Sequence, residues 1–158
     1  MTSARAAELA DNYVAANQEV IAFARSCTDE QWATMVPGEA WPVSVVIHHI
    51  AEAHAGAREW LETMVNGDAV TTTMEDIDGR NGEHAIRSSD VSIDDTVALL
   101  ESNGVLMEAV LRRLTDEDLA RTAPFGPANG QPLPVEQLAA VTAGHALGHL
   151  AHARDALN

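Results

Sequence analysis

The chain contains no lysine and a single cysteine, and both shortages restrict what the protein can be. Its 24 acidic residues face only nine arginines, so the formal net charge at pH 7 is −15. A surface this acidic repels phosphate backbones and anionic lipids, so we expect no nucleic-acid partner and no membrane partner. The lone Cys27 excludes an internal disulfide and fits a reducing compartment. We interpret it as a small apolar residue at the end of a helix rather than as a reactive thiol.

Long hydrophobic runs are also missing, and we expect no leader segment. Residues 1–11 have no apolar region typical of a signal peptide, and no later run reaches the length needed to span a bilayer. Aromatic residues make up only 4% of the chain while alanine is abundant, which favours packed helices over a β-sandwich. A length of 158 residues suits one ordinary domain. We therefore expect a soluble cytoplasmic protein with a single domain over residues 1–158.

Hydrophobic periodicity predicts four long helices and no strand. Apolar residues recur three and four positions apart over residues 4–25, 42–65, 92–114 and 134–158. Pro42 and Pro134 suit the first turn of a helix, and Ser92 begins a pattern that resembles a capping box. Sustained steps of three and four are typical of nearly aligned helices, so the sequence predicts an all-α four-helix bundle.

The segments between the predicted helices are similar in the two halves of the chain. Residues 28–33 (TDEQWA) resemble residues 115–120 (TDEDLA), and each segment precedes a proline and then a Pro-Val helix start. This pattern predicts two helical hairpins related by an approximate two-fold axis. The connection over residues 66–91 is long for a bundle, and we interpret it as a loop with a short helix over 81–87. A connection of this length can cross the bundle.

Three histidines share one face of the last predicted helix. His145, His149 and His152 follow one another at steps of four and three, which stack side chains on one face of a helix. Neutral imidazole is the commonest metal ligand, so the spacing predicts a metal shared by His145 and His149. It leaves open whether His152 is a fourth ligand, a hydrogen-bond partner of a ligand, or a group lining a pocket. Candidate acceptors for the second N–H of a ligand ring are Glu52, Thr142 and Asp155.

The other histidines lie upstream, and we expect a third ligand from the pair His48–His49. His49 lies beside the apolar stripe of its predicted helix, next to small residues that leave room for a site, whereas His48 lies on a polar row and should contact water. His54 falls on the apolar stripe itself, where a buried histidine bonded to a neighbour is the default. His84 is expected to be solvated or to lie at the rim of the site.

Two segments resemble the signature of the DinB-like superfamily. Residues 41–53 (WPVSVVIHHIAEA) are similar to the pattern W-[ST]-V-x-x-[VIL]-[VIL]-x-H-[LI]-A-[DE]-x-E, which assigns the metal histidine to His49 rather than to His48. Residues 145–152 (HALGHLAH) are similar to the His-x3-His of the last family helix. The segment from Asp78 to Asn81 also resembles a common family feature. The resemblance covers essentially the whole chain.

The resemblance implies a four-helix bundle in up-down-down-up order, with a divalent metal held by His49, His145 and His149. Zinc or nickel is the expected ion, with iron, cobalt and manganese as alternatives, and family members are often homodimers. The superfamily includes mycothiol-dependent maleylpyruvate isomerase and bacillithiol transferases. The isomerase branch tends to have a glutamate before the last histidine and an aspartate after it, where this chain has His145 and His152, and the chain has no room for that enzyme's second domain. The particular reaction therefore does not transfer.

Two classes of function fit these residues. A metal-dependent enzyme would use three neutral imidazoles, which leave the ion its full charge and an open position. Such an ion lowers the pKa of a bound water or thiol, with His152 as the predicted general base and His54 as the alternative. A hydrolase, or an S-transferase that uses a low-molecular-weight thiol, would act in this way on a small molecule. The alternative is a non-catalytic helical module, with or without a metal.

Overall fold

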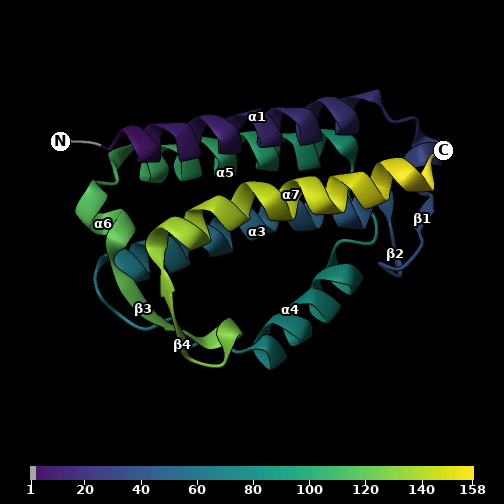
Figure 1. The fold of residues 1–158 in the computed structure, drawn as a ribbon. Coiled ribbons are helices and arrows are strands. Elements are labelled where there is room, and N and C mark those ends of the chain that lie inside the picture. Colours follow the sequence, from purple (N-terminus) through teal and green to yellow (C-terminus); the bar gives the residue numbers. More distant parts are fainter. Residues whose placement is uncertain (1–2) are drawn as a thin grey trace.

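Four long helices form the body of the protein in a computed structural model that describes residues 3–158. They are α1 (Ala4–Ser26), α3 (Val43–Val65), α5 (Ile93–Arg113) and α7 (Val135–Ala156). Helices α1 and α7 run in one direction and α3 and α5 in the other, so the bundle has the predicted up-down-down-up order (Figure 1). Both α1 and α3 pack against α5 and α7. No helix within residues 3–158 combines the length and the apolar character that crossing a membrane requires.

Shorter elements connect the long helices in the same order in both halves of the chain. The first half has α2 (Asp29–Trp32), β1 (Met35–Val36) and β2 (Trp41–Pro42), and the second has α6 (Asp116–Ala120), β3 (Thr122–Phe125), the 3-10 turn η1 (Gly126–Ala128) and β4 (Gln131–Pro134). Thr28 caps α2 and Thr115 caps α6, each through a capping box. This order agrees with the repeat in the sequence.

The two antiparallel hairpins, β1–β2 and β3–β4, show that the expectation of no strand was wrong. Their strands are two and four residues long. Such segments are too short to give a detectable alternation of apolar and polar residues.

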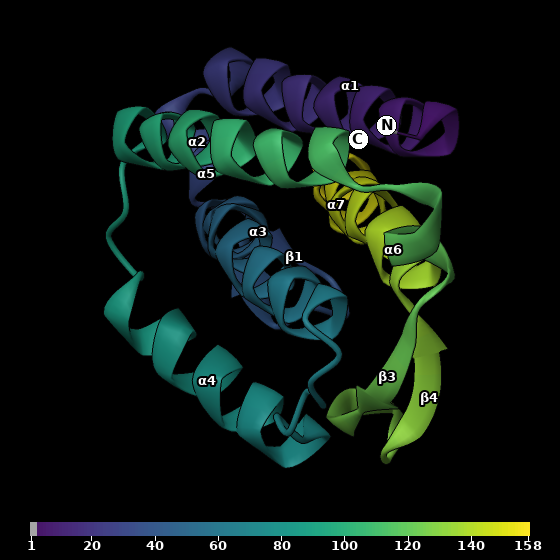
Figure 2. The ribbon, with the colours of Figure 1, turned by 90° about the vertical axis from the view of Figure 1, so that its left-hand side faces the viewer.

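The long connection contains a full helix, α4 (Met74–Arg87), and not the predicted short helix over 81–87. Thr73 caps α4 through a capping box with Asp76, so the run of threonines interpreted as loop ends in a helix start. Figure 2 shows α4 on the opposite side of α3 from α1, so α4 returns the chain along the outside of the bundle. Of the fourteen residues of α4, only His84 is buried.

Two apolar clusters fill the bundle, and a buried polar pair lies near its middle. His54 is 3% exposed and donates a hydrogen bond from Nε2 to Oδ1 of Asn17 at 2.9 Å. Asn17 in turn donates from Nδ2 to the carbonyl oxygen of Leu100 at 3.0 Å, and the ring of Tyr13 packs edge-on against His54. The expectation that His54 is a buried histidine bonded to a neighbour is confirmed.

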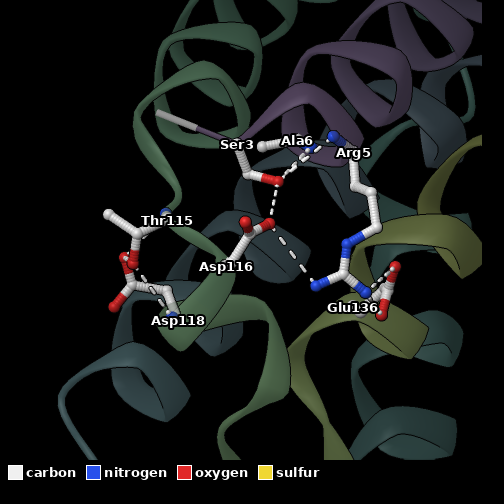
Figure 3. Close-up of polar contacts among 7 residues, drawn as sticks. All are labelled: Ser3, Arg5, Ala6, Thr115, Asp116, Asp118 and Glu136. Carbon is white, nitrogen blue, oxygen red and sulfur yellow. Dashed lines mark hydrogen bonds and ion pairs between the residues drawn. The ribbon is translucent and has the colours of Figure 1, made fainter. Parts of the chain in front are cut away.

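Polar contacts tie the start of α1 to the second half of the chain (Figure 3). Oγ of Ser3 accepts hydrogen bonds from the backbone N–H groups of Arg5 and Ala6 and donates one to Asp116. The guanidinium of Arg5 pairs with Glu136 at 3.0 Å and with Asp116 at 3.4 Å. Exposed ion pairs add little stability, so these contacts mainly orient α1 at the end of the bundle where β3 and β4 lie.

Candidate metal centre

Three histidine rings from two helices meet at the end of the bundle near β1 and β2. His49 lies in the second turn of α3, while His145 and His149 lie one turn apart between the middle of α7 and its end. Because α3 and α7 are packed antiparallel neighbours, the start of one faces the end of the other. One ring nitrogen of each histidine lies within 4.8 Å of the other two. The predicted ligand residues therefore converge.

The spacing of the ring nitrogens suits a common metal ion. Nε2 of His145 and Nε2 of His149 are 3.2 Å apart. Two nitrogens that each bind zinc at about 2.05 Å with a tetrahedral angle would be about 3.3 Å apart. The ring of His49 is 5.3 Å from that of His145 and 5.0 Å from that of His149, measured between centroids. No rearrangement of the helices is needed for the three rings to share an ion.

Burial and neighbouring rings keep the imidazoles of His49 and His145 neutral at pH 7. Burial lowers the pKa of His49 to about 3, and repulsion from the neighbouring rings of His145 and His149 adds to this effect. Burial and the neighbouring His149 lower the pKa of His145 to about 4. A metal ligand must present an unprotonated nitrogen, and both rings meet that requirement without an ion to displace the proton.

Glu39 forms hydrogen bonds with His149 and with the nearby His152. Its Oε1 accepts hydrogen bonds from Nδ1 of His149 at 3.0 Å and from Nδ1 of His152 at 2.6 Å. Burial would raise the pKa of Glu39, but the hydrogen bonds from His152 and His149 and their charge hold it below its usual value. An ionised carboxylate only accepts, so each ring donates a proton from Nδ1. In the neutral tautomer that this hydrogen bond selects, Nε2 of His149 carries no proton, and it lies 3.2 Å from Nε2 of His145.

Sequence reasoning missed Glu39 because the residue lies in a turn rather than on a periodic element. The turn between β1 and β2 has positive φ angles at Gly38 (85°) and at Ala40 (58°), and it packs near the end of α7. Two of the three candidate acceptors, Glu52 and Thr142, have other partners: Glu52 pairs with Arg87, and the hydroxyl of Thr142 donates to a backbone carbonyl of α7. A glutamate in a tight turn before the motif at residues 41–53 was the only signal in the sequence.

The remaining candidates for the site are His152 and His54. The side chain of His152 is 62% exposed and lies beside the three converging rings, connected to His149 through Glu39. His54 is bonded to Asn17 and belongs to none of the groups of described residues whose spacing suits a metal. The geometry therefore places His152, and not His54, next to the candidate metal position.

His84 was expected to be solvated or to lie at the rim of the site, and the first of these expectations is wrong. His84 is only 2% exposed, and its Nε2 lies 2.8 Å from Nδ1 of His48. The ring of His84 also packs against those of Trp41 and His49, with centroid distances of 5.9 and 5.7 Å. His48, expected to contact water, is half-buried in this contact. The reason is the length of α4: because it begins at Met74, its last turn reaches the side of α3.

Burial lowers the pKa of both His48 and His84, although the nearby carboxylate of Glu52 opposes the change. Six of the seven histidines of the chain thus lie close together on α3, α4 and α7. They form three groups whose spacing suits a metal: His49 with His145 and His149, His149 and His152 with Glu39, and His48 and His84 with Glu52.

Comparison with known proteins supports the fold and identifies the family. No curated protein matches the chain. Among solved structures, YfiT from Bacillus subtilis is similar, with a TM-score of 0.75 and 23% identity over 93% of this chain and 85% of that chain. YfiT is described as "a probable metal-dependent hydrolase with an unusual four-helix bundle topology", and at this identity the likeness shows a shared fold. The model of the DinB superfamily matches residues 12–153. The chain belongs to the DinB superfamily, as its motifs predicted.

Proposed function

We propose that this protein is a divalent-metal-dependent enzyme in which His49, His145 and His149 hold the ion. The observation that carries the proposal is the convergence of three ring nitrogens, two of them 3.2 Å apart. An all-imidazole donor set suits zinc or nickel. Three protein ligands also leave one coordination position open, as in catalytic rather than structural zinc sites.

The chain's own residues provide for proton transfer beside the open position. When bound, a divalent ion supplies a Lewis acid that lowers the pKa of a coordinated water or thiol. His152 donates its Nδ1 proton to Glu39, so its basic nitrogen is Nε2. An imidazolium formed at His152 would be stabilised by the carboxylate of Glu39, which lies 2.6 Å away. We assign His152 as the general base and Glu39 as the residue that positions both His152 and His149.

Hydrolysis of a small molecule is the reaction that these residues support best. Water is a sufficient nucleophile, and YfiT, which shares the fold, is described as a hydrolase. The chain's own thiol is unsuited to the chemistry: Sγ of Cys27 donates to the carbonyl oxygen of Phe23, and burial raises its pKa. Thiol transfer is the second candidate, favoured by the thiol transferases of the family, and it requires a low-molecular-weight thiol as co-substrate. A homodimer and a cytoplasmic location remain predictions.

Metal content and turnover of untagged protein test the proposal together. Elemental analysis should find a stoichiometric divalent metal, and His149→Ala should lose it. His54→Gln is the matched control, since it changes a buried histidine on α3 and keeps a donor for Asn17. The wild-type protein should then hydrolyse small esters or amides, or consume thiol, in a metal-dependent way. Bound metal that raises the melting temperature without any turnover would instead support the non-catalytic module. Metal content unaffected by His149→Ala would refute the site.

A further inference from the structure

A second group of potential ligands lies next to the first, between α3 and α4. His48 and Glu52 stand one turn apart on α3, and His84 reaches them from the last turn of α4. Nε2 of His84 is 2.8 Å from Nδ1 of His48 and 4.0 Å from Oε2 of Glu52. One donor atom from each residue lies within 4.8 Å of the other two. None of these residues belongs to the set of His49, His145 and His149.

We propose that His48, Glu52 and His84 form a second divalent-cation site that fastens α4 to α3. Two imidazoles and one carboxylate are a donor set that zinc uses in proteins. Ligand atoms around a tetrahedral zinc lie about 3.3 Å apart. On zinc binding, the distance between the nitrogens of His48 and His84 would therefore increase by about half an ångström. The distance from His84 to the oxygen of Glu52 would decrease by slightly more. Side-chain rotations alone can make changes of this size.

The weak attachment of α4 gives such an ion a structural task. His84 is the only buried residue of this helix, while Met74 and Ile86 are 48% and 81% exposed. A helix of fourteen residues is marginal by itself and depends on packing, yet α4 contributes almost no apolar surface to the core. Nδ1 of the buried His84 also has no hydrogen-bond partner among the described residues. A cation between α3 and α4 would add the cohesion that apolar burial does not supply.

Arg87 already pairs with Glu52 and would therefore compete with a divalent cation for this carboxylate. Its Nη2 contacts both carboxylate oxygens of Glu52 at 3.0 Å, and its side chain is 59% exposed. An exposed pair of this kind contributes little, so Arg87 can turn into solvent when a divalent ion binds. Removing Arg87 should strengthen cation binding by Glu52, whereas in a purely structural ion pair its removal would only loosen α4.

Zinc titration of untagged, chelator-treated protein against a chromophoric chelator tests the proposal. Wild-type protein should bind two equivalents, whereas His84→Gln and Glu52→Gln should each bind one with high affinity. Glu52→Gln changes a partly exposed side chain, so it tests the site even if replacement of the buried His84 causes misfolding. Arg87→Gln should bind two, with the second about three- to fivefold tighter, which corresponds to the loss of an exposed ion pair. His149→Ala should lose the zinc bound by His49, His145 and His149 and keep the zinc bound by His48, Glu52 and His84. A failure of one proposed site can then be distinguished from a failure of the other.

Amide hydrogen exchange over residues 74–87 gives a second readout. The second equivalent of zinc should slow exchange in α4 of the wild-type protein and should have no effect on α4 in Glu52→Gln. One equivalent in wild-type protein that His149→Ala abolishes would overturn the proposal. Equal stoichiometry in wild type, His84→Gln and Glu52→Gln would overturn it too. So would an Arg87→Gln variant in which α4 exchanges faster and zinc binds no more tightly.

Discussion

Replacing Glu39 by glutamine tests whether a carboxylate in a turn controls the candidate metal centre. The change keeps the shape of the side chain but removes the charge that accepts protons from Nδ1 of His149 and His152 at 3.0 and 2.6 Å. A hydrogen bond to a charged group contributes about 1.5–3 kcal/mol, and a glutamine amide can also donate to Nδ1 and so place the proton of His149 on Nε2. We therefore expect zinc affinity to fall about 10- to 100-fold, as for other carboxylates behind a ligand histidine.

The assay is a zinc competition titration at constant pH and ionic strength. Glu30→Gln is the matched control, because it removes the same charge from an exposed residue of α2 that has no described side-chain hydrogen bond. The control should bind zinc as the wild-type protein does. If Glu39→Gln matched this control, Glu39 would not set the proton position of His149, and our account of the ligand geometry would be wrong.

Three further predictions concern stability. As pH falls from 6.5 towards 4, chelator-treated protein should lose about 3 kcal/mol through His54 alone, because burial lowers its folded-state pKa to about 4 and the unfolded chain binds the proton first. Urea unfolding should show this loss, and the pH profile of His54→Gln should be flatter; equal slopes would contradict the assignment. Ala40→Gly should raise the free energy of unfolding by about 0.5–1 kcal/mol, since Ala40 has a φ of 58°. An unchanged midpoint of denaturation would show that the turn carries no strain. Gly104→Ala should cost about 1–3 kcal/mol, because a Cβ there would lie 2.4 Å from Nδ2 of Asn17, and an unchanged melting temperature would mean that Asn17 moves freely.

Much of the bundle and of the histidine group could be predicted because both depend on helical phase. Steps of three and four residues indicate which side chains share a face, so the convergence of His145 and His149 followed from spacing alone. For His49, helical phase placed the ring beside the apolar stripe and His48 on a polar row, and the family pattern then assigned the metal histidine to His49. The up-down-down-up order came from the same resemblance and agrees with the directions of the long helices.

Other features depend on tertiary contacts that periodicity does not encode. Glu39 reaches His149 across 110 positions of sequence, from a turn whose direction is set by two residues of positive φ. His84 was misplaced because the start of α4 was expected near residue 81, although Thr73 and Asp76 form a capping box that marks the true start. The hairpins were missed because strands of two to four residues leave no alternation to detect.

The direct test of the metal centre is X-ray absorption spectroscopy of protein loaded with one equivalent of zinc or nickel. Our account predicts a first coordination shell at about 2.0–2.1 Å with the multiple-scattering pattern of three imidazoles, and the loss of one imidazole in His49→Ala. A shell of oxygen atoms without imidazole scattering, or a spectrum that His49→Ala leaves unchanged, would contradict it.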